Sequence, residues 1–181
     1  MVTLGSLDAR PAVGAPELLA PPVAAFLAGW AAAADVEVAP IDPALADTAA
    51  FVSAYGVSPA TSANCVVVAG RRGGDERVAA CVVLATTRAD VNGAVRRLLD
   101  VRKASFLLMD RAVAETGMEY GGITPFGLPP GWRVLVDAQV AELPLTVVGS
   151  GVRHSKLVVP GAALAALPGA EVVPGLGVPV A

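Results

Sequence analysis

The sequence Gly121-Gly122-Ile123-Thr124-Pro125-Phe126-Gly127-Leu128-Pro129-Pro130 predicts a long ordered loop. Glycine lets the backbone approach another group closely, proline stiffens the chain, and Phe126 offers an apolar wall. Loops of this length without hydrophobic periodicity often carry function. Two interpretations stay open: a segment that approaches a ligand, and a rigid connector that crosses the end of a sheet.

A second glycine motif, Gly149-Ser150-Gly151, follows a predicted strand over 146–148. It resembles half of the Gly-x-Ser-x-Gly elbow of hydrolases, but the complete elbow does not occur. We favour a turn whose free backbone amides recognise an anion or a carbonyl over a nucleophilic serine. The glycine-rich motifs that bind nucleotide phosphates are also missing from the sequence.

The elements around these motifs indicate an α/β domain with a mixed sheet. Apolar runs at Cys65 and Cys81 flank Gly73-Gly74 and predict a hairpin over about 64–86. A two-residue turn places Cys65 opposite Val82, whereas a register shifted by one residue would oppose the two thiols. Elements interleave without a strict βαβ repeat, so a doubly wound sheet is not expected. The other predicted helices span 17–32, 43–56, 90–99, 110–117 and 161–166, and the other predicted strands span 36–39, 103–108, 134–136, 146–148, 156–159 and 171–173.

The length of 181 residues fits one domain, and the hydrophobic content of 55% with only 4% aromatic residues reflects small aliphatic side chains. The longest uncharged run, 18–34, is too short for a membrane span and contains Pro21-Pro22. Its four terminal alanines imitate the cleavage site of a signal peptide. Asp8 and Glu17 precede the run, which favours an amphipathic first helix instead.

The charge is unevenly distributed. The formal net charge of −3 argues against a protein that coats nucleic acid. Residues 61–103 nevertheless contain eight basic and four acidic residues. This segment fits either a phosphate-bearing partner on one face or arginines that are simply solvated.

Metal chemistry is not expected, because the two cysteines lack metal-ligand spacing and the chain has one histidine, His154. Buried apolar thiols are the favoured interpretation of Cys65 and Cys81. His154 could act as a base near neutral pH, but its position beside Arg153 and Lys156 is more typical of a surface residue.

The motifs occur in a distinctive order, which is Ser62-Ala63-Asn64-Cys65-Val66-Val67-Val68, Arg88-Ala89-Asp90-Val91-Asn92, Gly121 to Gly127, Leu135-Val136-Asp137 and Gly149-Ser150-Gly151. This order resembles the YbaK/ProX-like aminoacyl-tRNA deacylase family, whose fold also occurs as the editing insertion of bacterial prolyl-tRNA synthetases. The resemblance implies a single compact α/β domain with a curved mixed β-sheet flanked by helices over 35–175. Residues 1–34 would form a helical extension packed on this domain, and 176–181 a C-terminal tail.

The resemblance also implies a function. Family members hydrolyse the ester of a misacylated tRNA in a pocket that receives its 3′ end, because binding alone rejects near-isosteres poorly. It implies a cytoplasmic protein of translation fidelity that uses no metal or organic cofactor and binds neither DNA nor membrane; a homodimer stays open. The implied catalytic residues are Asn64, Gly149, Ser150 and Gly151, and the implied substrate-binding residues are Thr124, Pro125, Phe126, Gly127, Asp137, His154 and Lys156.

Asn64 departs from the family, whose members usually carry a lysine at this position. Asparagine donates hydrogen bonds but supplies no positive charge, so charge stabilisation would rest on backbone amides, Lys156 or Arg153. Two hypotheses follow: a deacylase, and a catalytically silent module that binds an aminoacyl-adenosine or an amino-acid-like ligand. A third is an interaction domain that docks through the apolar residues 174–181. If the family pocket is retained, Asn64, Phe126, Ser150 and His154 should line one cavity.

Overall fold

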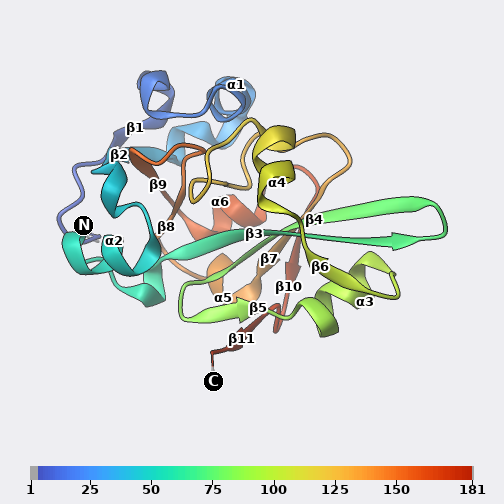
Figure 1. Cartoon of the computed structure of the whole chain (residues 1–181). Coiled ribbons are helices and arrows are strands. Elements are labelled where there is room, and N and C mark those ends of the chain that lie inside the picture. The colour runs from blue at the N-terminus through green and yellow to red at the C-terminus, as the bar shows by residue number, and fades with distance from the viewer. Residues whose placement is uncertain (1–3, 181) are drawn as a thin grey trace.

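A long β-hairpin organises the larger sheet of the protein (Figure 1). In the computed structural model, which describes residues 4–180, strands β3 (Ala63–Arg72) and β4 (Asp75–Leu84) pair along their full length. Gly73 adopts a φ of +61° in the two-residue turn, a conformation that glycine tolerates readily. Cys65 therefore lies opposite Val82, as the two-residue turn predicts, and both cysteines are free thiols.

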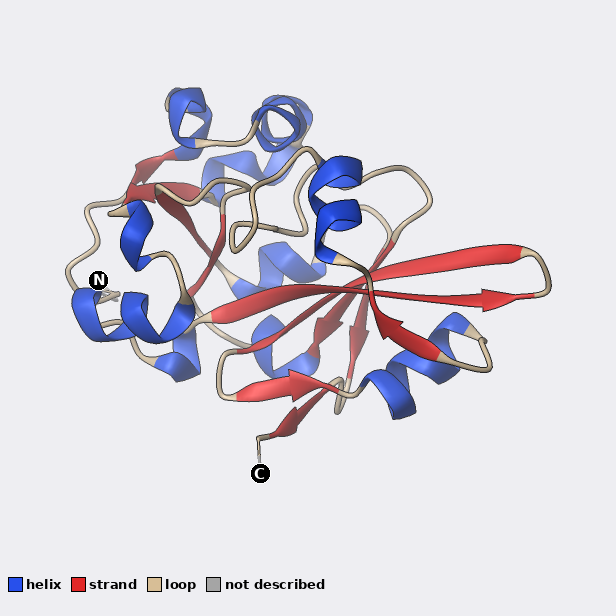
Figure 2. Ribbon diagram, viewed as in Figure 1, coloured by secondary structure: helices blue, strands red, loops and turns tan. Residues whose placement is uncertain are grey.

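The hairpin is the middle of a five-stranded sheet with the order β10-β7-β4-β3-β6. Strands β7 (Arg133–Asp137) and β10 (Ala170–Val173) run parallel to β4, and β6 (Ala104–Phe106) pairs antiparallel with β3. The sheet is therefore mixed, and helices flank it (Figure 2), which confirms the predicted fold class.

A second, antiparallel sheet has the order β1-β2-β9-β8. Its strands are β1 (Arg10–Pro11), β2 (Glu37–Pro40), β9 (Ser155–Val159) and β8 (Thr146–Gly149). A single bridge between Ser62 and Val147 connects it to the start of β3.

The end of the chain belongs to a third pairing, in which β11 (Gly177–Pro179) lies antiparallel to β5 (Thr87–Ala89). Leu176 is fully buried beside it. The chain itself thus uses one edge of β11 and the side chain of Leu176, while docking of residues 174–181 on another protein stays a prediction.

The helices are short. The predicted helix 17–32 is wrong as a continuous element, because Leu19-Ala20 and Trp30 are extended and divide it into three pieces. An extended residue before Pro21 is what the proline ring demands. The α-helices are α1 (Pro21–Gly29), α2 (Thr48–Tyr55), α3 (Arg96–Leu99), α4 (Met109–Thr116), α5 (Ala138–Ala141) and α6 (Gly161–Ala165). Within residues 4–180 there are also five 3-10 helices, which are Ala12–Gly14, Pro16–Leu18, Ala31–Asp35, Pro43–Leu45 and Pro59–Thr61. One π-helical turn spans Val91–Val95.

The predicted helix ends are accurate where capping chemistry sets them. Asp90 accepts hydrogen bonds from the Gly93 and Ala94 amides at 3.0 and 2.8 Å and so begins the segment 91–99. Gly56 and Gly117 end α2 and α4 in the left-handed conformation. Between residues 4 and 180, the structure contains no helix that is long and apolar enough to cross a membrane.

The N-terminal segment packs against both glycine motifs. Phe126 is fully buried between Phe26 and Trp30, with ring centroids 6.0 and 5.8 Å away in edge-to-face arrangements. A Cβ on Gly127 would lie 2.3 Å from the Pro22 carbonyl oxygen, and one on Gly151 would lie 2.4 Å from the Ala20 Cβ. The two motifs are thus where residues 20–30 meet the sheets.

This contact predicts that Gly127→Ala destabilises the protein much more than Gly131→Ala. Both glycines have positive φ, +72° and +85°, so both substitutions cost about 1 kcal/mol in backbone strain. Only at Gly127 does the new methyl group overlap backbone atoms, which adds about 1–3 kcal/mol. Urea denaturation measures the difference, and equal losses for the two variants would contradict the packing described above.

Candidate functional site

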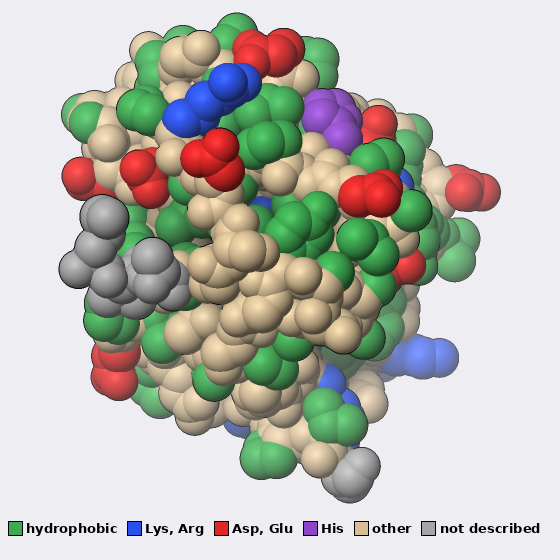
Figure 3. Space-filling model, turned by 90° about the vertical axis from the view of Figure 1, so that its left-hand side faces the viewer, with side chains coloured by type: hydrophobic (Ala, Val, Ile, Leu, Met, Phe, Trp, Pro, Cys, Tyr) green, Lys and Arg blue, Asp and Glu red, His purple; other side chains and the backbone are tan. Residues whose placement is uncertain are grey.

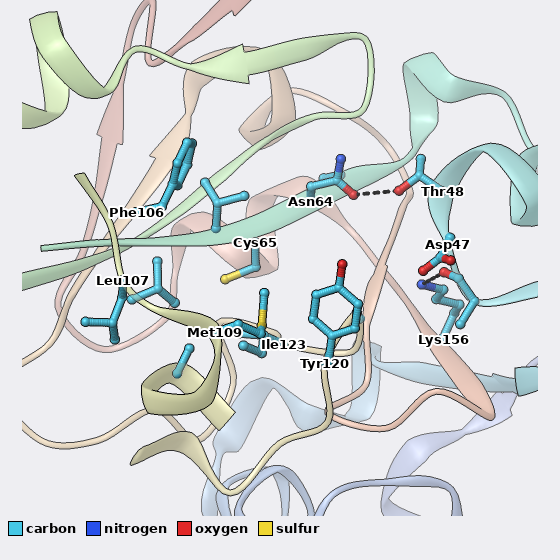
Figure 4. A pocket seen from close by; sticks show the side chains of 17 residues that line it. Asp47, Thr48, Asn64, Cys65, Phe106, Leu107, Met109, Tyr120, Ile123 and Lys156 are labelled. Atoms are coloured by element: carbon cyan, nitrogen blue, oxygen red, sulfur yellow. Dashed lines mark hydrogen bonds between the residues drawn. The ribbon is translucent and has the colours of Figure 1, made fainter. Parts of the chain in front are cut away.

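A pocket of 480 Å³ opens at the edge of β3 (Figure 4). Side chains from α2, β3, the segment around β6, α4, the Gly121 loop and the β8–β9 pair surround it. The lining residues are Ala46, Asp47, Thr48, Ala63, Asn64, Cys65, Val66, Val67, Phe106, Leu107, Met109, Ala112, Tyr120, Gly121, Ile123, Gly149 and Lys156.

The pocket exists because β6 covers only part of the outer edge of β3. Strand β6 pairs with residues 68–70 of β3, and the last contact is the Leu107 amide, which donates to the Val67 carbonyl at 2.9 Å. Backbone groups alternate between the two edges of a strand. Those of Cys65 therefore point to the same edge as those of Val67, where no strand follows, and they face the pocket.

One end of the pocket is polar. Thr48 donates a hydrogen bond to the Asn64 side-chain oxygen at 3.0 Å, which fixes the orientation of the amide and leaves its NH₂ group as a donor. Lys156 enters from β9, and Figure 4 shows it beside Asp47 on the same side of the pocket as Thr48. The arrangement places two kinds of donor, a neutral amide and an ammonium, at one end of the cavity.

Lys156 is a buried cation. Its side chain is only 9% exposed, its Nζ donates to the Ala46 carbonyl at 3.0 Å, and it lies 5.3 Å from the centre of the Phe51 ring. Burial, with a smaller contribution from the charge of Arg153, lowers the pKa of Lys156 to about 8, while Asp47 opposes the shift. The ammonium form therefore predominates at neutral pH but is weakly solvated and close to titration.

The other end of the pocket is apolar. Val67, Leu107, Ala112 and Ile123 belong to one buried cluster that closes this end. Large apolar side chains are exposed around the pocket: Phe106 by 58%, Met109 by 44% and Tyr120 by 57%. A ligand with a polar head and an uncharged side chain matches this division.

The two glycine motifs contact each other through their backbones. The Gly151 amide donates to the Gly122 carbonyl at 2.7 Å. A Cβ on Gly149 would lie 2.5 Å from that oxygen, and one on Gly122 would lie 2.8 Å from the Val152 oxygen. These glycines permit packing between loops, as the connector interpretation expects, and only Gly121, Ile123 and Gly149 of the two motifs line the pocket.

The expectation that Asn64, Phe126, Ser150 and His154 line one cavity is wrong, so the pocket implied by the resemblance is not retained with these four residues. Asn64 lines the pocket, together with Gly149 and Lys156. Phe126 and Ser150 have no exposed surface, because the aromatic cluster encloses the first and a serine network encloses the second. His154 faces the N-terminal segment instead, with its Nε2 3.3 Å from the Glu17 carbonyl oxygen.

Ser150 is held in place by the chain around it. Its hydroxyl donates to the Ser155 and Val152 carbonyls at 3.0 and 3.2 Å and accepts from the Ser155 hydroxyl at 2.7 Å. Asp137 is also buried, and its carboxylate accepts hydrogen bonds from the Gln139 and Gly177 amides. Both side chains fix loops and strand ends near the pocket without reaching it.

The remaining predicted residues, Thr124, Pro125 and Gly127, do not line this pocket either. Thr124 is fully buried, and its hydroxyl is the one buried side-chain polar atom without a partner in the described part of the chain. Pro125 and Gly127 line a separate hollow of 220 Å³ beside Phe26 and Trp132. Within residues 4–180 no cluster of three or more His, Cys, Asp or Glu residues could hold a metal ion.

Several pocket residues were not predicted, namely Thr48, Tyr120, Phe106, Leu107, Met109 and Ile123. Met109 and Ala112 are three residues apart on α4, a spacing that places them on one face of the helix. The sequence alone could therefore show that these two residues share a face of the helix. It could not show that α4 lies beside β3, because that position depends on the tertiary structure.

Comparison with protein families shows that residues 42–167 match the aminoacyl-tRNA editing domain. The match covers more than half of the chain, so the protein belongs to this family, whose partner is tRNA. Comparison with curated proteins gives no significant match.

Two solved structures share the fold. A protein described as a candidate trans-editing enzyme for prolyl tRNA synthetase superposes with a TM-score of 0.72 at 19% sequence identity, over 86% of this chain and 94% of the other. A scaffold protein used for epitope backbone grafting gives a TM-score of 0.72 at 22% identity, over 89% and 97% of the two chains. At these identities the likeness concerns the fold alone.

The thiols provide a test of the pocket. Burial raises the pKa of the Cys65 thiol, with a contribution from Cys81, and burial raises the pKa of Cys81 to about 12. Because only thiolates are alkylated, both cysteines should react with iodoacetamide at pH 8 roughly tenfold or more slowly in the folded protein than in urea. Cys65 lines the pocket and Cys81 is fully buried, so mass spectrometry should find Cys65 modified first. Equal rates for the two thiols would contradict access through the pocket.

Proposed function

We propose that this protein is a trans-acting deacylase that hydrolyses the ester bond of a misacylated tRNA. The observation that carries the proposal is the pocket itself, which combines a buried ammonium, an amide and an open strand edge in a chain of the aminoacyl-tRNA editing family. We place its action in the cytoplasm, where aminoacyl-tRNA is used for translation.

The two ends of the pocket fit the two parts of the substrate. The terminal ribose and the ester would occupy the polar end, near Asn64 and Lys156, and the amino-acid side chain would extend toward Val67, Leu107 and Ile123. The Cys65 backbone amide and the Asn64 NH₂ group are the neutral donors available to the ester. Uncharged walls exclude charged side chains, because burying an unpaired charge is costly.

Lys156 supplies the charge that Asn64 lacks. The oxygen of a water molecule bonds to the ester carbonyl carbon, and the carbonyl oxygen gains negative charge. When this intermediate collapses, the bond to the ribose oxygen breaks and that oxygen takes the proton that the water gives up, which releases the free amino acid and the ribose hydroxyl. An ammonium in a poorly solvated site stabilises such developing charge far better than one in water. Gly149, Ser150 and Gly151 act as positioning residues, because they hold the start of β9 and so the lysine.

Incubation of the purified protein with a panel of misacylated tRNAs tests the proposal, beginning with alanyl- and cysteinyl-tRNA for proline. The expected result is loss of the ester from at least one of them faster than in buffer. Ester loss at the buffer rate for every member of the panel would overturn the proposal.

Replacement of Lys156 by methionine should reduce the deacylation rate by on the order of 10²-fold, as expected for the loss of a charged group that stabilises the transition state. The exposed Arg88, changed to methionine, is the matched control for the loss of one positive charge and should keep the wild-type rate. An unchanged rate in Lys156→Met would contradict the assigned role.

The pH dependence provides an independent check. Because the pKa of Lys156 is about 8, the ammonium is present below this pH and is lost above it. The ratio of the catalysed to the uncatalysed rate should therefore fall as the pH rises through 8. In Lys156→Arg the charge persists, and this fall should disappear. A ratio that rises through pH 8 in the wild type would assign the lysine as a base instead.

Asn64 favours a second candidate function, a silent module that binds an aminoacyl-adenosine or an amino-acid-like ligand. The amide can hold a carbonyl but brings no charge to β3. For this candidate, a non-hydrolysable aminoacyl-adenosine analogue should bind the wild type without turnover of the natural ester, and hydrolysis should appear in Asn64→Lys. Turnover by the wild type would exclude it.

A further inference from the structure

We propose that a basic groove beside the β3–β4 hairpin binds the phosphate backbone of the tRNA acceptor stem. We call this the hairpin groove and define it by Arg71, Arg72, Arg102, Lys103 and Arg111. The inference rests on the proposed function, because it assigns the rest of the same tRNA to a surface that continues from the pocket.

The hairpin groove consists of two adjoining hollows. One has a volume of 420 Å³ and the other a volume of 590 Å³, and both are lined by Arg71 and Arg102. Among the lining residues of the two hollows Glu76 is the one carboxylate. The full lining set is Ala69, Gly70, Arg71, Arg72, Gly73, Glu76, Arg102, Lys103, Ser105, Phe106, Leu107, Leu108 and Arg111.

Three of the cations are available to a ligand. Arg71, Arg102 and Lys103 are exposed, and within residues 4–180 their side chains make neither an ion pair nor a hydrogen bond. The other two are partnered, since Arg111 holds Glu76 and Glu115, and Arg72 holds Asp100. Glu76 accepts two hydrogen bonds from Arg111, at 3.0 and 2.9 Å, and Arg111 also binds Glu115. The three exposed cations therefore give the groove its positive charge.

A close backbone contact brings these cations together. Gly70 pairs with Ala104 in the β3–β6 ladder, so Arg71 and Lys103 follow as neighbours at the end of that ladder. A Cβ on Gly70 would lie 2.5 Å from the Val101 Cγ2 and 2.6 Å from the Lys103 carbonyl oxygen. The absence of a side chain at Gly70 therefore lets the segment 101–103 lie against β3.

The groove and the pocket share one face of β3. Side chains alternate along a strand, which places Cys65, Val67, Ala69 and Arg71 on the same face. Arg71 follows Cys65 by six positions along the strand, a distance of about 20 Å. Phe106 and Leu107 line both the pocket and the groove, so the two are continuous. With the ester at the polar end of the pocket, the single-stranded 3′ end would run back over the exposed Phe106, along the about 20 Å of β3, and bring the preceding phosphates to the groove.

The opposite end of the molecule differs in charge. In Figure 1 the hairpin extends to the right, and Figure 3 shows the left-hand end, where hydrophobic and uncharged atoms cover most of the surface and basic side chains are few. The chain has a net charge of −3, yet Arg71, Arg102 and Lys103 place three exposed cations together on the surface to which the pocket leads. Phosphates fit this site better than an acidic peptide does, because the exposed Phe106 beside the cations also offers a base a stacking surface.

The test compares two triple variants with the same loss of charge. The groove variant carries Arg71→Gln, Arg102→Gln and Lys103→Gln. The control carries Arg88→Gln, Arg96→Gln and Arg97→Gln, whose exposed side chains lie outside the groove linings and likewise make no ion pair among residues 4–180. The probe is a fluorescent RNA hairpin that contains the acceptor stem and its single-stranded CCA end, and binding is measured by anisotropy between 50 and 200 mM salt.

The groove variant should bind the hairpin about tenfold or more weakly than the wild type, and its salt slope should be smaller by about 2–3. The control should match the wild type in both quantities. With an aminoacyl-CCA trinucleotide, which reaches only the pocket, hydrolysis by the groove variant should equal that of the wild type. Equal hairpin binding by the two triple variants would overturn the proposal.

The outcomes separate the two proposals. If the wild type hydrolyses neither full tRNA nor the trinucleotide, the deacylase function fails, whatever the hairpin binding shows. If the wild type hydrolyses both and the groove variant matches the control in hairpin affinity, the function stands and the groove assignment fails. Hairpin affinity that does not vary with salt would also overturn the groove assignment.

Discussion

The backbone contact between Gly122 and the Gly149–Val152 turn holds the site together. A hydrogen bond of 2.7 Å joins the two loops, and the missing side chains on both of them allow it. The same loops receive the N-terminal segment on their other side, through Gly127 and Gly151. Because β9 follows the second loop directly, this contact also sets where Lys156 lies. Packing against neighbouring segments, rather than close approach to a ligand, accounts for Gly122, Gly127, Gly149 and Gly151 in the two motifs.

The site itself results from an interruption in a sheet. Strand β6 ends before it reaches Cys65, and the second sheet contacts only the start of β3, so a length of strand edge stays open. An open edge in a sheet normally invites unwanted pairing. Here the side chains of α4 and the Gly121 loop surround it, which converts an unpaired strand into one wall of a pocket. Asn64 and Lys156 come from different sheets and meet only at this gap.

The charge distribution and the topology support the same arrangement. The basic segment 61–103 contains the hairpin and the start of β6, and the fold turns part of it into one groove on the pocket face of β3. Other arginines of that segment lie outside the groove linings, on α3, β4 and β5, and some arginines pair with carboxylates. Asp100, for example, binds both Arg72 and Arg77. A count of charges along the chain therefore locates the basic region but not the cations that remain free.

Local chemistry determined much of the fold. The Gly73-Gly74 turn fixed the hairpin register, Asp90 and Gly56 fixed helix ends, and the order of motifs indicated the editing-domain family. The sequence could not show which face of each loop meets solvent, because loops without periodicity carry no signal of direction. The motifs predict pocket positions for Phe126 and Ser150, but Phe126 is buried against Phe26 and Trp30, and Ser150 is buried in a network with Ser155. What the sequence determined by itself is the family and, except for β1, the strands of the two larger sheets. Only the tertiary structure decided the site, because its walls come from segments far apart in the chain and its charge from a lysine on another sheet.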